Sequence, residues 1–198
     1  MLKLNKLNIA DWFSLYRVIA VPLLLTFVWY DERLLFSWFL LISYSTDAID
    51  GFLARKLKIT SARGSQLDSF GDQLTLIVAL IGLVVFEPDF IKDNLILIAI
   101  AFVPYIIQMI IAFRKYGKTT AFHTYLAKLS AIVQSVFILW LLFFNPVYWL
   151  FYVMIVLGVL ETIEEIMLIF MYDDWVEGVK GIYWALMDKR RAKSQMNK

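Results

Sequence analysis

Long apolar blocks constrain this chain more than any other feature. They cover residues 13–30, 34–53, 68–86, 94–113, 125–144 and 147–171. Each block is close to the about 20 residues that a helix needs to cross about 30 Å of hydrocarbon. The blocks are continuous and do not alternate in polarity, which favours helices over a membrane barrel. We therefore expect an all-α polytopic membrane protein with six transmembrane helices.

Composition supports a membrane protein with a single domain. Of the 198 residues, 61% are hydrophobic, against roughly 45–50% in soluble domains. No repeat or linker divides the chain, so we expect one integral-membrane domain over residues 1–198, with no removed signal peptide. A short N-terminal helix should precede the first span, and the aromatic and basic stretch 175–191 should form a C-terminal interfacial helix. Cysteine is absent, which excludes disulfides and thiolate metal sites.

Loop charges predict the orientation. The connectors after the second and fourth blocks are basic and contain no acid, and both chain ends carry lysines or arginines. In the connectors on the opposite side, the only basic residues are Arg33 and Lys92. By the positive-inside rule both termini lie in the cytoplasm, and we expect a prokaryotic inner membrane. A basic face made of membrane loops suits anionic lipids and phosphorylated substrates and argues against nucleic acid.

Two pairs of aspartates stand at one end of the second and third blocks. Asp47 and Asp50 are three residues apart, and Asp68 and Asp72 are four apart, so each pair shares a helix face. The short basic connector lets the four carboxylates converge on the cytoplasmic side. Two unit charges 4 Å apart repel by about 4 kcal/mol at an effective dielectric of 20, and a divalent cation removes this repulsion. All-oxygen ligands favour Mg²⁺ or Mn²⁺ over zinc.

The residues between these aspartates have properties that suit a phosphate ligand. Gly51 lets a ligand approach the backbone, and the planar fork of Arg55 can hold a phosphate. Gly64 and Gly71 allow the third helix to pack closely. The alternative is that the four acids only mark helix ends and pair with nearby lysines or arginines.

The whole string resembles the signature of the CDP-alcohol phosphotransferase family. It reads Asp47-x2-Asp50-Gly51-x2-Ala54-Arg55-x8-Gly64-x3-Asp68-x3-Asp72 and agrees with the family at every fixed position. The resemblance implies that a hydroxyl of an acceptor alcohol attacks the phosphate of a CDP-linked alcohol and that CMP leaves. This chemistry belongs to phospholipid biosynthesis.

The same resemblance implies roles for single residues. Two divalent ions would be held by Asp47, Asp50, Asp68 and Asp72, and Asp72 would act as the general base. The candidate CDP-binding residues are Gly51, Ala54, Arg55 and Gly64. The donor is expected to be CDP-diacylglycerol, and the family's tendency to pair implies a homodimer.

One departure from the family pattern lies in the first block. Ser14 and Arg17 fit, but Asp11 stands where an asparagine is usual. This weakens any contact of residue 11 with the nucleotide. Asp11 could instead cap the first helix, and Arg17 could either reach the membrane interface or contact the cytidine side.

A basic stretch that runs from the end of the fourth block into the start of the fifth is the candidate acceptor site. Arg114, Lys118 and Lys128 lie on the same predicted side as the aspartates. A phosphorylated acceptor of the glycerol 3-phosphate or inositol phosphate type would give these cations a function; otherwise they enforce topology. His123 is interpreted as a polar loop residue rather than a ligand.

Three glutamates fall inside the last block. Glu161, Glu164 and Glu165 could form internal salt bridges or hydrogen bonds, with Lys128 or Arg17 as candidate partners, or a second metal site. Two other functions compete with phosphotransfer. An intramembrane magnesium-dependent prenyltransferase normally has aspartate motifs further apart, and a small cation transporter would distribute its acids along a path.

Overall fold

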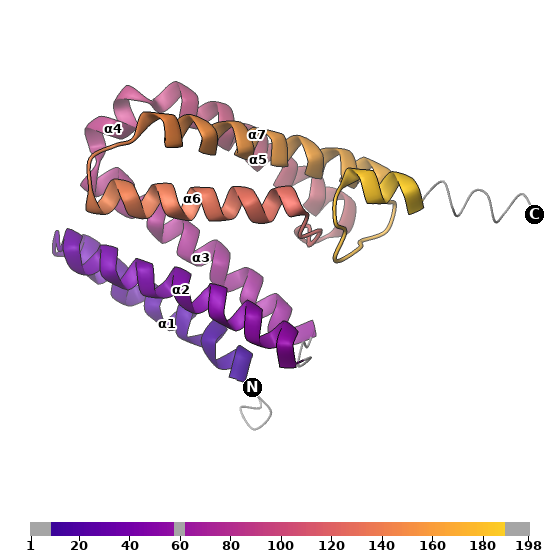
Figure 1. The fold of residues 1–198 in the computed structure, drawn as a ribbon, viewed down its shortest axis with the longest axis horizontal. Coiled ribbons are helices and arrows are strands. Elements are labelled where there is room, and N and C mark those ends of the chain that lie inside the picture. Colours follow the sequence, from indigo (N-terminus) through magenta and orange to yellow (C-terminus); the bar gives the residue numbers. More distant parts are fainter. Residues whose placement is uncertain (1–8, 58–61, 189–198) are drawn as a thin grey trace, which may run out of the picture. The chain divides into compact units, whose positions relative to one another are not determined.

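The computed structural model describes residues 9–57 and 62–188 of the chain, and its elements are helices. In order they are α1 (Ile9–Trp29), α2 (Arg33–Leu57), α3 (Ala62–Phe86), α4 (Pro88–Asp93), α5 (Leu95–Tyr116), α6 (Tyr125–Phe143) and α7 (Tyr148–Met171). A further short helix covers residues 182–188 (Figure 1). The all-α prediction is confirmed.

The six predicted blocks each coincide with one long helix, but the boundaries differ. The short helix α4 was not predicted; it begins at Pro88, where the missing N–H and fixed φ of proline suit a first helical position. The expected N-terminal helix is not a separate element from residue 9 onward, because α1 runs unbroken from Ile9. Residues before Ile9 lie outside the described part.

Apolar helices and apolar surfaces identify a membrane protein. Among the residues searched, α5 and α6 are long and apolar enough to cross a bilayer, and α1 and α3 contribute shorter apolar stretches at Ile19–Trp29 and Gln73–Phe86. Helix α7 has 24 residues but carries three glutamates. Large side chains such as Ile96 and Trp29 are mostly exposed, which suits lipid better than water. Six spans stay a prediction.

The described chain divides into two compact units, and the first contains α1, α2, α3 and α4 together with residues 138–145. Helix α1 packs against α2 and α3 (Figure 1). The fully buried Leu24, Phe36 and Leu40 form part of its core. Gly82 of α3 faces the Phe36 ring so closely that a Cβ there would overlap it. This glycine therefore allows α2 and α3 to approach.

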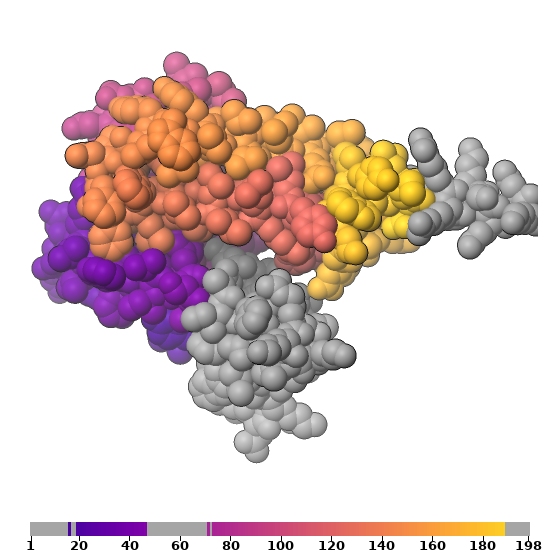
Figure 2. Space-filling model, in the orientation of Figure 1, coloured from indigo at the N-terminus to yellow at the C-terminus, as the bar shows by residue number. Residues whose placement is uncertain are grey.

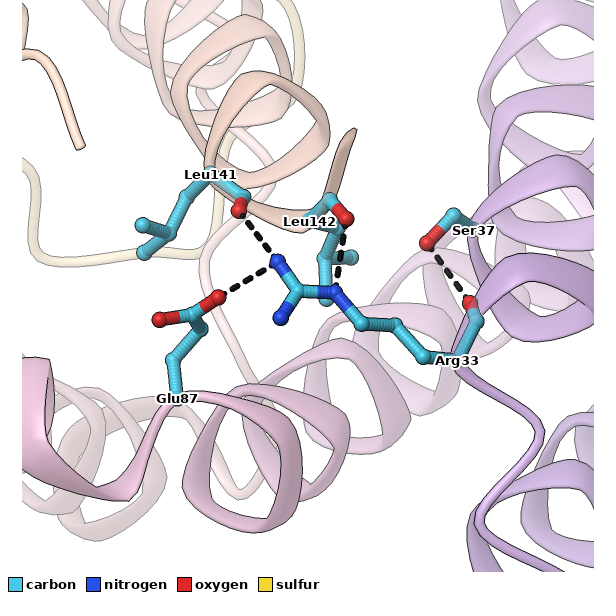
Figure 3. Close-up of polar contacts among 5 residues, drawn as sticks. All are labelled: Arg33, Ser37, Glu87, Leu141 and Leu142. Atoms are coloured by element: carbon cyan, nitrogen blue, oxygen red, sulfur yellow. Dashed lines mark hydrogen bonds and ion pairs between the residues drawn. The ribbon is translucent and has the colours of Figure 1, made fainter. Parts of the chain in front are cut away.

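A polar contact, which we call the Arg33 clamp, fixes one end of this unit. The guanidinium of Arg33 donates from Nε to the Leu142 carbonyl at 2.9 Å and from Nη2 to the Leu141 carbonyl at 3.0 Å. Nη2 also pairs with Glu87 Oε1 at 2.5 Å (Figure 3). The two carbonyls belong to the last turn of α6, where no intrahelical partner exists. Arg33, predicted as a connector charge, thus joins α2, the end of α3 and the end of α6.

The second unit contains α5, α7, residues 125–137 of α6 and the C-terminal residues. Helix α5 packs along α7. Buried Ala112, Phe122, Leu168 and Ile169 share a core with residues that follow α7. Helix α5 ends at Gly117, whose φ of 70° is the left-handed conformation common at helix C-termini. Helix α6 is capped by Thr124, whose Oγ1 accepts from the Ala127 amide at 3.0 Å.

The chain after α7 folds back over the α5–α6 connector, which comprises residues 117–124. We call residues 172–188 the C-terminal strap. Its Gly178 amide donates to the Ala121 carbonyl at 3.1 Å, and its Lys180 carbonyl accepts from the Tyr125 amide at 3.1 Å. In Figure 2 the yellow atoms of the strap adjoin those at the start of α6. The stretch predicted to form a surface helix is thus helical only from residue 182 and is tied to the connector before that.

Candidate active site

The two halves of the aspartate motif lie on two adjoining helices. Asp47 and Asp50 belong to α2, and Asp68 and Asp72 belong to α3; these helices pack against each other. All four positions are helical, as the apolar blocks that contain them predict, and both helices also continue past those blocks. The i, i+3 and i, i+4 spacings therefore place the members of each pair on one face of their helix.

The side chains of the motif lie outside the described residues. This holds for the four aspartates and for the candidate CDP-binding residues Gly51, Ala54, Arg55 and Gly64. The backbone places the first three of these on α2 and Gly64 on α3. Asp11, Ser14 and Arg17 fall on α1, and their side chains are likewise outside the described part.

One turn before Asp47, a serine differs from its neighbours on α2. Ser37 and Ser45 each donate their hydroxyl to the carbonyl four residues earlier, at 2.8 Å and 2.7 Å. Ser43 is only 1% exposed, and its Oγ has no hydrogen-bond partner among the described side chains and backbone. A buried hydroxyl without a partner is unfavourable by about 1–3 kcal/mol. Ser43 was not singled out from the sequence, because helical serines commonly bond to their own backbone.

The predicted acceptor cations occupy separate places in the second unit. Arg114 lies near the end of α5 and is exposed. Lys118 lies in the connector with its ammonium 3.5 Å from the centroid of the Trp175 ring, and Lys128 lies in the first turn of α6, 5.7 Å from the Tyr125 ring. Arg114 has no ion pair within the part of the chain that the structure describes. His123 is an exposed connector residue with φ of 55°, as its interpretation as a loop residue predicts.

The glutamates of α7 form hydrogen bonds, and Lys128 is not among the partners that the structure describes. Glu165 Oε2 accepts from Gln108 Nε2 and from Thr120 Oγ1, both at 2.7 Å. Gln108 also donates to Thr120 at 3.2 Å. We call these three residues the Glu165 network. The described donors to Glu165 are neutral groups of α5 and the connector, so the prediction of Lys128 as its partner is wrong. Arg17 stays a prediction, because its side chain is outside the described part.

The other two glutamates of α7, Glu161 and Glu164, also have identifiable partners. Glu161 is hydrogen-bonded to Ser130 of α6. Glu164 Oε1 accepts from the Ile182 amide at 3.1 Å, while its buried Oε2 has no partner in the described part of the chain. Among the side chains that the structure describes, no group of three or more histidine or acidic residues could hold a metal ion. The α7 glutamates therefore connect elements of the second unit rather than forming a three-ligand metal site.

The roles of several residues of the second unit were not predicted from the sequence. Gln108 stands out afterwards as a buried polar residue in an otherwise apolar helix. Trp175 donates from its indole nitrogen to the Thr119 carbonyl at 3.0 Å, across 56 residues of chain. A contact between such distant residues has no local sequence signal.

Comparison with known proteins gives one family and several relatives. A CDP-diacylglycerol–glycerol-3-phosphate 3-phosphatidyltransferase of Yersinia pestis (strain Pestoides F) is 36% identical over 81 residues, covering 38% of this chain and 43% of that relative. A protein of the same name from Blochmanniella floridana is 39% identical over 77 residues, covering 37% of this chain and 40% of the relative. The chain thus matches less than half the length of these curated relatives.

The family match is far longer than the match to any of these relatives. The model of the CDP-alcohol phosphatidyltransferase family covers residues 7–163, which include α1 to α6, the first part of α7 and the complete aspartate motif. The C-terminal strap lies beyond this match. With the motif halves on adjoining helices, the match shows that the chain belongs to the CDP-alcohol phosphatidyltransferase family.

Proposed function

We propose that this protein transfers the phosphatidyl group of CDP-diacylglycerol to glycerol 3-phosphate and releases CMP. The observation that carries the proposal is the complete aspartate motif on α2 and α3 of a membrane protein of this family. Family membership favours this reaction over the prenyltransferase and cation-transporter alternatives. The names of the two relatives above favour glycerol 3-phosphate over inositol phosphate, serine or another alcohol as the acceptor.

The donor set fits a hard divalent cation. Asp47, Asp50, Asp68 and Asp72 supply carboxylate oxygens, the ligands that Mg²⁺ and Mn²⁺ prefer. The chain has no cysteine, and its one histidine lies in the α5–α6 connector rather than on α2 or α3. When bound, two such ions would neutralise the charge that develops on the attacking and leaving oxygens of the diphosphate.

The residues of the motif have different roles in the transfer. Asp72 accepts the proton of the acceptor hydroxyl while the hydroxyl oxygen forms a bond to the phosphorus next to diacylglycerol. The bond from that phosphorus to the bridging oxygen breaks, and CMP leaves with the electron pair. Arg55 holds a phosphate of the CDP group by its planar fork, and Gly51 lets that group approach the backbone. Ala54 and Gly64 complete the CDP-binding side.

Orientation and assembly are part of the proposal. We infer that the α2–α3 and α5–α6 connectors both face the cytoplasm, because both are basic and free of acids. The site would then release CMP, which is soluble, into the cytoplasm. A cysteine introduced at Thr119 should then be labelled from the cytoplasm and one at Asp89 from outside. We also propose a homodimer, on the family's tendency to pair.

The test is CMP release by the purified protein with CDP-diacylglycerol, Mg²⁺ or Mn²⁺ and one alcohol at a time. Glycerol 3-phosphate should give CMP and a phosphorylated phosphatidylglycerol in equal amounts. Serine, free inositol and inositol phosphate should give much less. Asp89→Asn, an exposed carboxylate on α4, is the matched control and should retain full activity. Failure to release CMP with every alcohol would contradict the proposal.

A further inference from the structure

The contact between Lys118 and Trp175 joins a candidate acceptor cation to a segment outside the family match. The ammonium of Lys118 lies 3.5 Å from the centroid of the Trp175 ring, well within the about 6 Å range of cation–π attraction. Lys118 itself is exposed. One side of the ammonium thus meets the ring, and its other N–H groups can still bind an anion.

Trp175 also fixes the backbone next to this lysine. Its indole N–H donates to the carbonyl of Thr119, the residue after Lys118, at 3.0 Å. The same side chain therefore holds both the charged end of Lys118 and the main chain that carries it. Trp175 is half-buried, so the hydrogen bond is partly shielded from water.

The rest of the strap keeps Trp175 in place. Residues Ala121 and Glu177 form an isolated parallel bridge, and the Gly178 amide donates to the Ala121 carbonyl at 3.1 Å. On the preceding side, Tyr116 Oη donates to the Tyr172 carbonyl at 2.7 Å. Trp175 is thus attached on both sides to the chain around the connector.

We propose that Trp175 is a positioning residue that preorders Lys118 to bind the phosphate of the acceptor. A free lysine loses side-chain entropy when it grips a phosphate, whereas a lysine already held by a ring loses less. The proposal rests on the proposed function, in which the acceptor carries a phosphate. It adds a role for the strap, which follows the family domain in this chain.

The expected effect is a selective weakening of acceptor binding. Loss of one ordered side chain corresponds to about a 2- to 12-fold rise in KM for glycerol 3-phosphate in Trp175→Ala. The KM for CDP-diacylglycerol and kcat should change little, because the proposed effect of Trp175 acts through Lys118, which we assign to the acceptor. Trp175→Phe keeps a ring over Lys118 and loses the N–H, so it should restore part of the acceptor affinity.

A double-mutant cycle separates positioning of Lys118 from general stability. In a Lys118→Ala background, Trp175→Ala should have no further effect on the acceptor KM. Tyr183→Ala is the matched control, because Tyr183 lies in the same strap, is exposed, and has its ring against Trp184 rather than against the ring of Trp175 or Tyr125. It should leave the acceptor KM unchanged. Trypsin should cleave after Lys118 faster in Trp175→Ala than in the unaltered protein, which reports on the connector without any turnover.

Three results would overturn the proposal. They are an unchanged acceptor KM in Trp175→Ala, equal losses toward both substrates, and an equal KM rise with and without Lys118. In each case CMP would still be released, so the proposed function would stand. Absence of CMP release from the unaltered protein would overturn the proposed function and this proposal together.

Discussion

The Arg33 clamp and the Glu165 network differ in the kind of partner that stabilises an ionisable side chain. Each holds a charged group between helices of an apolar protein. In the Arg33 clamp, the guanidinium faces the opposite charge of Glu87 and two carbonyls of α6 (Figure 3). In the Glu165 network, the donors that the structure describes are the neutral side chains of Gln108 and Thr120.

This difference predicts how far the charge can be removed from each contact without loss of stability. A paired charge loses its partner when either side is neutralised, which leaves the other charge uncompensated. A carboxylate bound by neutral donors can be replaced by an amide that keeps an acceptor oxygen. Glu87→Gln should therefore be more disruptive than Glu165→Gln, although both keep size and shape.

The largest effect is expected at Arg33. Arg33→Ala removes the ion pair with Glu87 and both hydrogen bonds to the end of α6. Fully buried pairs lose 3–5 kcal/mol when broken, and because the Arg33 side chain is 40% exposed we expect a loss of about 3 kcal/mol. Thermal unfolding in detergent measures it. Lys92→Ala is the control: its pair with Asp89 is exposed, and an equal loss in both variants would contradict the clamp.

A smaller effect is expected at Glu165. Glu165→Ala removes the acceptor that Gln108 and Thr120 share and leaves Gln108 with its 3.2 Å bond to Thr120. The lost hydrogen bonds should reduce the free energy of unfolding by about 2 kcal/mol. Glu165→Gln keeps one acceptor oxygen and should lose less than half of that. The same unfolding measurement compares the two variants. If Glu165→Gln were as unstable as Glu165→Ala, the charge itself would be needed and the contrast with the Arg33 clamp would fail.

The smallest effect is expected where the strap meets Glu164. Gly181 has φ of 150°, and a Cβ there would lie 3.1 Å from Glu164 Oε1, the acceptor of the Ile182 amide. Gly181→Ala should cost about 1 kcal/mol and speed amide hydrogen exchange in residues 182–188. Gly158→Ala in α7 is the matched control, because its Cβ would meet nothing within 4 Å. Helix propensity predicts that this control stabilises the protein, by about 0.5–1 kcal/mol. Equal exchange in the two variants would contradict the role of Gly181.

Much of the fold could be predicted because it depends on local pattern. Continuous apolar blocks mark the long helices, and fixed spacings mark the aspartate motif, so both follow from residues close together in sequence. Helix α4 was missed because its six residues, PDFIKD, are half charged and the segment is too short to show a period. The helical ends of α2 and α3 were shortened in the prediction because charged residues interrupt the apolar pattern there.

The contacts that hold the second unit could not be predicted from the sequence. The candidate partners named for the α7 glutamates were the cations Lys128 and Arg17, whereas the described donors to Glu165 come from a glutamine and a threonine 57 and 45 residues away. The strap was interpreted as a surface helix because its aromatic and basic residues suit an interface. Its attachment to the connector depends largely on backbone amides and carbonyls, which every residue but proline offers alike.

The central claim is that the four motif aspartates hold the metal ions that drive phosphatidyl transfer. Its most direct test is CMP release from CDP-diacylglycerol and glycerol 3-phosphate by Asp50→Asn and Asp68→Asn, alongside the unaltered protein with and without excess chelator. We predict that both variants keep the unfolding temperature of the unaltered protein and release no CMP above background. Chelator should abolish release by the unaltered protein, and Mg²⁺ or Mn²⁺ should restore it. Full CMP release in excess chelator, or by either variant, would contradict the claim.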